Sequence, residues 1–197
     1  MQIDIDILLA WGASIKNFKK GELIFEEGTE ARRYYQIISG EVKMYNINND
    51  GKEFTQGVFY DGSSFGEPPI FIKEPYPSST VAVKYSVIIR IAADDFMKIL
   101  DEYPSLQKQF LVEFARRIFS KSTTLRDITN NPPESRILSF LNVTKKKNGS
   151  PKERILIPFT RQEIANLTGL RVETVIRTLI KMQEQDKVEI INHKLYF

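Results

Sequence analysis

Residues 160–179 read Thr-Arg-Gln-Glu-Ile-Ala-Asn-Leu-Thr-Gly-Leu-Arg-Val-Glu-Thr-Val-Ile-Arg-Thr-Leu, and they predict two short helices around one glycine. Thr160 and Glu163 have the spacing of a capping box, in which each side chain accepts a hydrogen bond from the backbone of the other, so a helix is expected to begin here. Gly169 is expected to break that helix, because the turn leaves little room for a side chain. The second helix is predicted from its apolar residues, which are Val172, Val175, Ile176 and Leu179.

Two short helices around a glycine turn are typical of the helix-turn-helix unit, whose second helix enters the major groove of DNA. Arginine can pair with guanine there, and glutamate can accept from cytosine. An acidic residue weakens plain phosphate binding, so Glu173 favours sequence-specific reading; alternatively, it only complements the positive end of the helix. The outward positions at the start of the second helix are Arg171, Glu173, Thr174 and Arg177.

A small hairpin is predicted after the second helix, because residues 188–191 and 194–197 are largely apolar and flank Asn192 and His193. This hairpin would be the wing of a winged helix-turn-helix, with His193 in its turn. The two helices and the wing thus form one small DNA-binding unit in the prediction.

A hinge and a further helix are predicted upstream of this unit. Asn131 can cap the helix, Pro132 suits its first turn, and Glu134 lies three residues after the cap. The helix is expected to end in a basic loop over residues 145–150. The boundary of the DNA-binding domain is therefore predicted near residue 130, and the domain itself spans residues 131–197.

Charge is unevenly distributed along the chain. Residues 135–197 carry 12 Lys/Arg and 6 Asp/Glu, whereas residues 1–134 carry 16 and 19. A basic C-terminal module is expected to bind a polyanion such as DNA. The alternative is that the solvent-exposed faces of the two halves merely differ in composition, and the charge distribution alone does not distinguish the two interpretations.

The N-terminal half is predicted to be an antiparallel β-sandwich or roll. Seven of the ten glycines lie between Gly21 and Gly66, and they separate short β-rich runs. Residues 48–51, Asn-Asn-Asp-Gly, predict a tight hairpin turn because these residues tolerate positive φ. A short helix is expected over residues 3–11 and another over 93–100. Together they form a predicted domain of residues 1–104.

A long helix is predicted between the two domains, over residues 105–130. Its apolar residues follow a heptad-like spacing, and a helix between two domains cannot bury such a stripe against either domain alone. A two-fold partner could bury it; the alternative is an ordinary core helix, and Lys121 within the stripe argues against a strict coiled coil. The predicted dimer residues are Leu111, Phe114, Ile118 and Leu125.

Composition excludes several classes of protein. The chain has no cysteine, which excludes disulfides, iron–sulfur clusters and thiol catalysis. A histidine-rich metal site or a Ser/His/Asp triad would have to be built around the single histidine, His193. No apolar run reaches the ~18 residues of a membrane span, and the N-terminus carries acids where a secretory signal carries cations. A cytoplasmic protein without catalytic activity, metal or cofactor is expected.

The residues 160–179 resemble the cyclic-AMP receptor protein/FNR (CRP/FNR) family of bacterial transcription regulators, and the similarity extends over nearly the whole chain. The glycine motifs of the β-rich half match as well: Lys20-Gly21-Glu22, Glu27-Gly28, Ile38-Ser39-Gly40-Glu41-Val42 and Phe65-Gly66-Glu67. The resemblance implies Val172, Glu173 and Arg177 as the base-contacting residues, closer to the FNR branch than to the cyclic-AMP branch. Ile176 departs from the serine of the FNR branch. The full set of predicted DNA-binding residues is Thr160, Arg161, Gln162, Arg171, Val172, Glu173, Thr174 and Arg177.

The resemblance also implies an effector pocket in the β-roll. Cyclic-nucleotide binders use a Gly-Glu carboxylate for the ribose and an arginine for the phosphate, about fifteen residues before the closing-strand isoleucine. Counted back from Ile91, that arginine position holds Tyr76, and Pro68-Pro69 removes two backbone N–H donors. Losing a charge-assisted contact to phosphate removes about 1.5–3 kcal/mol, so cyclic AMP is not expected to bind. The predicted pocket residues are Gly66, Glu67, Tyr76, Ser78, Ser79 and Thr80.

The sequence therefore predicts an α+β protein with an N-terminal double-stranded β-roll of the cyclic-nucleotide-binding type, a long dimerisation helix and a C-terminal winged helix-turn-helix. The expected partners are palindromic double-stranded DNA, a second copy of the chain, RNA polymerase and an unknown small-molecule effector, without a membrane. Two other classes of protein share parts of this pattern. A cyclic-nucleotide-binding module that acts on a protein is disfavoured by the basic wing and by the face of Glu173 and Arg177. A cupin-like metalloenzyme is disfavoured by the lack of a histidine cluster.

Overall fold

The computed structural model describes residues 2–148 and 154–197. For residues 123–130 and 147–148 it describes the backbone only. The chain divides into two compact units, residues 1–117 and residues 118–197. The division falls within the long helix α4 (Pro104–Asn130). The predicted three-part division at residues 104 and 130 stays a prediction.

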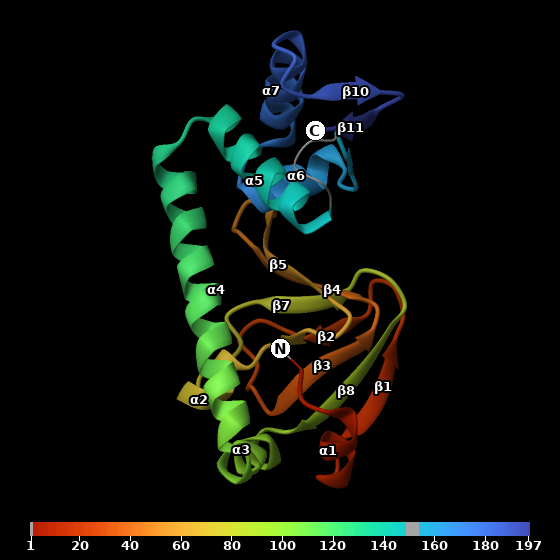
Figure 1. The fold of residues 1–197 in the computed structure, drawn as a ribbon, viewed down its shortest axis with the longest axis vertical. Coiled ribbons are helices and arrows are strands. Elements are labelled where there is room, and N and C mark those ends of the chain that lie inside the picture. Colours follow the sequence, from red (N-terminus) through yellow and green to blue (C-terminus); the bar gives the residue numbers. More distant parts are fainter. Residues whose placement is uncertain (1, 149–153) are drawn as a thin grey trace. The chain divides into compact units, whose positions relative to one another are not determined.

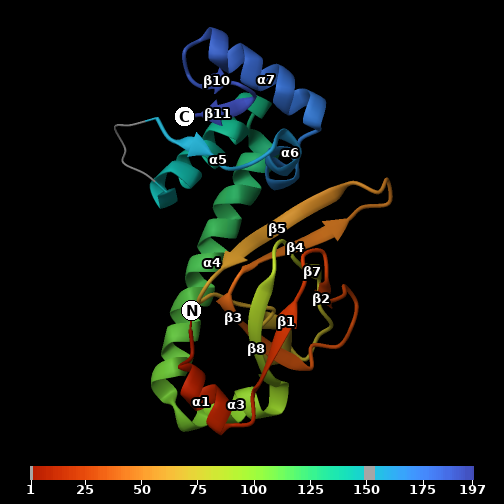
Figure 2. The ribbon, with the colours of Figure 1, turned by 90° about the vertical axis from the view of Figure 1, so that its right-hand side faces the viewer.

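Two four-stranded antiparallel sheets form the first unit (Figures 1 and 2), and they confirm the predicted antiparallel roll. One sheet has the order β1 (Ser14–Phe18), β8 (Ser86–Ala92), β3 (Arg33–Ser39) and β6 (Ser64–Phe65). The other has the order β2 (Leu23–Phe25), β7 (Ser79–Ala82), β4 (Glu41–Ile47) and β5 (Glu53–Tyr60). The long β4–β5 hairpin turns at Gly51, whose φ is +74°.

Alternation along β3 divides the core of this unit into two clusters, because successive strand residues point to opposite faces. Tyr35 and Ile37 pack in one cluster, together with Phe25, Phe65 and other aromatic residues. Tyr34 packs in the other cluster, beneath the helices that cover the first sheet. These helices are α1 (Ile5–Ala10), α2 (Pro68–Ile72), α3 (Ala93–Glu102) and the start of α4.

Helices α3 and α4 are separated at Tyr103, and Pro104 is the first residue of α4, one residue before the predicted start of the long helix. Proline is well suited to that position, because the first helical N–H has no intrahelical partner in any case. The predicted short helix over residues 3–11 is also present, with Asp4 as its cap.

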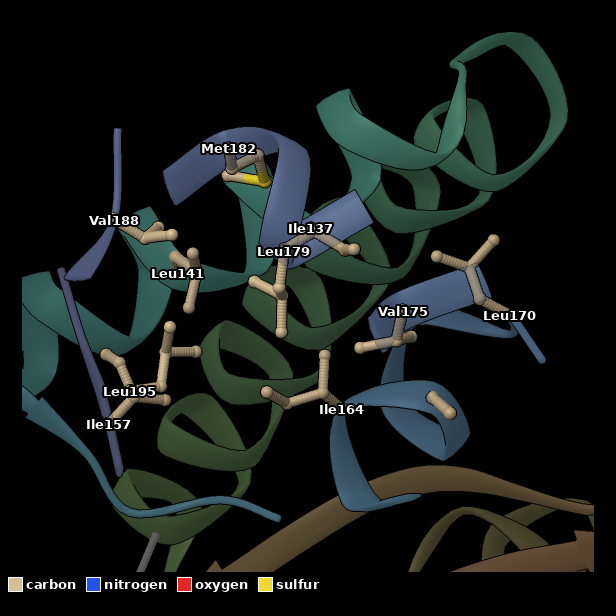
Figure 3. Close-up of a cluster of buried hydrophobic side chains, with 11 residues drawn as sticks. Ile137, Leu141, Ile157, Ile164, Leu170, Val175, Leu179, Met182, Val188 and Leu195 are labelled. Atoms are coloured by element: carbon tan, nitrogen blue, oxygen red, sulfur yellow. The ribbon is translucent and has the colours of Figure 1, made fainter. Parts of the chain in front are cut away.

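The second unit contains α5 (Pro133–Asn148), β9 (Leu156–Ile157), α6 (Arg161–Thr168), α7 (Val172–Glu184), β10 (Glu189–Ile191) and β11 (Lys194–Tyr196). The strands form a three-stranded sheet in the order β10-β11-β9. Strand β9 was not predicted from the sequence. One buried cluster joins the three helices to this sheet (Figure 3), including Ile137 of α5, Ile164 of α6, Leu179 of α7 and Leu195 of β11.

Two details of the predicted α5 are wrong. The helix begins at Pro133 rather than directly after Asn131, a shift within the usual uncertainty of helix ends. The predicted loop over residues 145–150 is in part helical, since α5 continues to Asn148. Gly149 and Ser150 lie outside the described residues. The run of three lysines lets the helix continue because lysine is a good helix former.

Candidate nucleic-acid interface

Helix α6 begins with the capping box that the sequence predicts. The Thr160 hydroxyl accepts a hydrogen bond from the Glu163 backbone N–H at 3.2 Å, and Glu163 Oε2 accepts from the Thr160 N–H at 2.6 Å. Gly169 ends the helix in the left-handed region, with φ of +65°, where a side chain would add strain. Both ends of α6 are therefore set by local chemistry.

Helix α5 holds the end of α6 through Arg136. The Arg136 guanidinium donates to the Thr168 carbonyl in the last turn of α6, where a cation stabilises the negative end of a helix. Burial lowers the pKa of Arg136. This side chain was not among the predicted functional residues, because no local pattern links it to a carbonyl 32 residues away.

Helix α7 has one buried and one exposed face. Val175, Leu179 and Met182 are fully buried in the second-unit core (Figure 3). Val172 is partly buried and packs against the same core. Thr174 is half-buried. Ile176, which the sequence analysis counted with the apolar residues of this helix, is 43% exposed. From position 171 to position 180, the exposed side chains are Arg171, Glu173, Ile176, Arg177 and Ile180.

The predicted residues at the start of α6 have different environments. Thr160 is held in the capping box, and Gln162 is exposed and donates to Asn166 at 2.9 Å. Arg161 is half-buried, and this burial lowers the pKa of its guanidinium. The start of α6 thus offers one accessible amide and one partly covered cation.

The predicted wing is confirmed as the β10–β11 hairpin. Ile191 pairs with Lys194, and the two residues between them, Asn192 and His193, have φ of +47° and +65°. Positive φ at both central residues is the signature of a type I′ turn, which matches the twist of the flanking strands. His193 is therefore a turn residue, and the tip of the wing is exposed.

In the predicted effector pocket of the first unit, the Glu67 carboxylate is paired with a cation of the chain itself. Glu67 is fully buried, and its Oε2 accepts from the Arg117 guanidinium of α4 at 3.1 Å. Arg117 also donates to the Ser64 carbonyl at 3.1 Å and to Glu113 at 3.0 Å. Arg117 was missed in the sequence analysis; a buried carboxylate demands a cation, but nothing in the sequence tells which one.

Tyr76 lies in the buried core of the first unit. Its ring stacks on Phe25 at a centroid distance of 3.8 Å, and its hydroxyl donates to the Arg33 carbonyl at 3.1 Å. Burial raises the pKa of Tyr76. Gly66 has φ of +75°, and a Cβ there would lie 2.9 Å from the Phe25 ring, so only glycine fits beside this stack.

The hydroxyl residues of the predicted pocket are divided between two environments. Ser79 Oγ accepts from the Glu27 N–H at 3.0 Å. The Ser78 and Thr80 hydroxyls and Glu67 Oε1 are buried and make no hydrogen bond within the described part of the chain. Of the predicted pocket residues, Gly66 and Tyr76 thus lie against the Phe25 ring, whereas three of the buried polar atoms have no partner among the described residues.

The predicted dimer residues on α4 do not all point the same way. Leu111 and Ile118 are 70% and 66% exposed, whereas Phe114 is half-buried and packs against Phe71 and Phe110 at centroid distances of 5.4 and 5.9 Å. The Leu125 side chain lies outside the described residues. Leu111 and Ile118 are seven residues apart, so they lie on one face of the helix.

Metal sites and membrane spans are two other features on which the described residues give a result. No cluster of three or more possible metal-ligating side chains occurs among them. None of the described helices is both long and apolar enough to cross a membrane. The exposed face of α7, with the wing beside it in one folded unit, is that of a winged helix-turn-helix protein.

The comparisons with known proteins agree with this class. The family model of the cyclic nucleotide-binding domain matches residues 15–103, and that of the Crp-like helix-turn-helix domain matches residues 135–196. The chain is 27% identical over 179 residues to the fumarate and nitrate reduction regulatory protein of Yersinia pestis, covering 89% of this chain and 71% of that protein. It is 28% identical over 166 residues to the CRP-like cAMP-activated global transcriptional regulator of Mycobacterium tuberculosis, covering 83% and 74%.

Solved structures show the same fold. The c-di-GMP responsive global regulator CLP of Xanthomonas campestris matches with a TM-score of 0.83 at 19% identity, covering 96% of each chain. A CooA mutant of Carboxydothermus hydrogenoformans matches with a TM-score of 0.82 at 17% identity, covering 100% of this chain and 87% of that one. The chain belongs to the CRP/FNR family of transcription regulators, which bind DNA, are typically homodimers and are not enzymes.

Proposed function

We propose that this regulator binds a palindromic DNA site as a homodimer, with α7 as the reading helix in each half-site. The supporting observation is the exposed N-terminal face of α7, where Arg171, Glu173 and Arg177 project from a helix whose opposite face is locked in the core. Base contacts come from the first turns of such a helix. The start of α6 is assigned to contacts with the DNA phosphate backbone, which position the protein without reading the base sequence. The residues assigned to these contacts are Thr160, Arg161 and Gln162.

Selection of binding sites from a random DNA library tests this proposal. The full-length protein is expected to recover a palindrome whose half-sites contain a guanine for Arg177 and a cytosine for Glu173. Recovery of no common site, or of a site without two-fold symmetry, would contradict the proposal. Gel-shift titration of the selected duplex against a scrambled duplex of equal length is the control for non-specific binding.

Homodimerisation is assigned to the exposed seam of Leu111 and Ile118 on α4, with Leu125 as a further member. Exposed leucine and isoleucine two turns apart leave an apolar stripe that a second copy of the same helix can cover. Phe114, which faces its own core, is assigned to the edge of this seam rather than to its centre.

Cyclic AMP is not the effector in this proposal. The relative from Mycobacterium tuberculosis is described as cAMP-activated, but here Tyr76 stacks on Phe25 at the position where the resemblance implies an arginine. The Glu67 carboxylate is already paired with Arg117. Calorimetric titration with cyclic AMP and cyclic GMP is therefore expected to show no saturable binding below about 100 μM. Micromolar affinity for either nucleotide would overturn this part of the proposal.

We further propose that the DNA-bound dimer acts in the cytoplasm and contacts RNA polymerase. The support is the membership in a family of transcription regulators. Transcription in vitro with purified RNA polymerase, on templates with and without the selected site, is expected to change only when the site is present. An unchanged transcript level on both templates would contradict the polymerase contact.

A further inference from the structure

The exposed face of α7 carries two isoleucines among its charged side chains. Ile176 and Ile180 are 43% and 50% exposed, four residues apart, on the same side as Glu173 and Arg177. Neither isoleucine is in the buried cluster of the second unit, which takes Val175, Leu179 and Met182 from this helix. The fold of the unit therefore does not require an apolar residue at position 176.

The position of Ile176 along the helix places it among the base-reading residues. Helix α7 begins at Val172, so Ile176 lies about 6 Å along the helix axis from its start, and Ile180 lies about 12 Å along it. The N-terminal residues of a recognition helix contact base edges, whereas residues further along it move away from them. Ile176 is within that zone and directly precedes Arg177.

Thymine is the base that an exposed aliphatic side chain can read. Of the four bases, only thymine presents a methyl group in the major groove, and apolar side chains recognise it by burying it. We propose that Ile176 packs on the C5 methyl group of a thymine next to the guanine read by Arg177, in each half-site. This inference rests on the proposed DNA reading by α7, and it adds one base of stated identity to the half-site.

Removing only the methyl group tests the contact. The duplex selected by the full-length protein is resynthesised with one thymine position replaced by deoxyuridine in both half-sites, and each thymine is tested in turn. One buried methyl is worth about 0.8 kcal/mol, so the wild type is expected to bind about fourfold more weakly per half-site, or about 15-fold for the palindrome, at one position only.

Two variants identify the side chain that makes the contact. For Ile176→Ala, replacing the responsive thymine by deoxyuridine is expected to cost no affinity, because the side chain that contacts the methyl group is absent. In the matched control Ile180→Ala, which removes an equally exposed isoleucine one turn further along, the full loss is expected to remain. Circular dichroism should show equal folding of all three proteins, since both side chains are exposed.

The outcomes separate this inference from the proposed function. A selected palindrome in which no thymine responds to loss of its methyl would overturn the inference while leaving DNA reading by α7 intact. The inference would also be overturned if Ile176→Ala still bound the deoxyuridine duplex more weakly than the thymine duplex, or if Ile180→Ala bound the two duplexes equally. Failure to select any palindrome would instead contradict the proposed function itself.

Discussion

Arg116 and Arg117 are neighbours in the sequence, yet their environments differ strongly. Arg117 is 24% exposed and donates to the fully buried Glu67 carboxylate, whereas Arg116 is 75% exposed and reaches Glu113 only at 4.0 Å. Removing one partner of a buried ion pair leaves an uncompensated charge, which is far more costly than loss of an exposed pair.

Arg117→Ala is therefore expected to lower the free energy of unfolding of the first unit by about 2–3 kcal/mol, with the lower figure reflecting partial access of water to Arg117. Arg116→Ala is the matched control and is expected to change it by less than about 0.5 kcal/mol. Urea denaturation followed by circular dichroism measures both. Equal effects of the two substitutions would contradict the role assigned to Arg117.

Arg177 and Lys146 differ in the kind of DNA contact that we expect of them. Arg177→Ala should lower the affinity by about 1–3 kcal/mol per half-site and remove the preference at one guanine. Lys146, exposed on α5, should add at most sequence-independent charge, so Lys146→Ala should weaken all duplexes alike and less so at high salt. Site selection with each variant is the measurement. An unchanged consensus for Arg177→Ala would exclude α7 as the reader.

The capping box of α6 is a local element whose energy can be isolated. Thr160→Ala removes the oxygen that accepts from the Glu163 N–H, and it is expected to cost about 1 kcal/mol of stability in the second unit. Thr160→Ser keeps that oxygen and should cost little. Thermal unfolding of the two variants distinguishes them, and equal losses would show that the methyl group rather than the cap matters.

Helix α4 presents its exposed seam to a second copy in our proposal. Ile118→Glu would place like charges opposite each other across a two-fold axis and should yield monomers of 22.8 kDa. Sedimentation at micromolar concentration measures the mass, and the wild type is expected at twice this value. Ile15→Glu, which changes an exposed isoleucine on β1, is the control and should stay dimeric. A monomeric wild type would refute the seam.

The two-fold symmetry of a dimer should appear in its DNA site. Two reading helices presented by a two-fold dimer are expected to enter the major groove one helical turn apart, with half-site centres ~10 bp apart. Inserting five base pairs between the selected half-sites turns them to opposite faces of the duplex, and it should reduce binding to that of a single half-site. Retention of full affinity after this insertion would show that the half-sites are read independently.

Local features of this protein were predictable because they depend on residues close together in the chain. The capping box of Thr160 and Glu163, the turn at Gly169 and the wing turn at Asn192-His193 each involve a few neighbouring residues whose backbone preferences act without the rest of the fold. The antiparallel roll was predictable for a similar reason, since short β-rich runs with glycines between them leave few other arrangements.

Contacts between distant residues could not be predicted in the same way. Phe25 and Tyr76 stack across 51 positions, and Arg117 reaches Glu67 across 50. Ile176 was assigned by pattern to the apolar residues of its helix, yet the packing of α7 against α5 and α6 leaves it exposed. Periodicity indicates which residues can share a helix face, but the register of strands and the packing of helices decide which side chains meet. Strand register and helix packing are set by the lowest free energy of the whole chain and not by any short stretch of it.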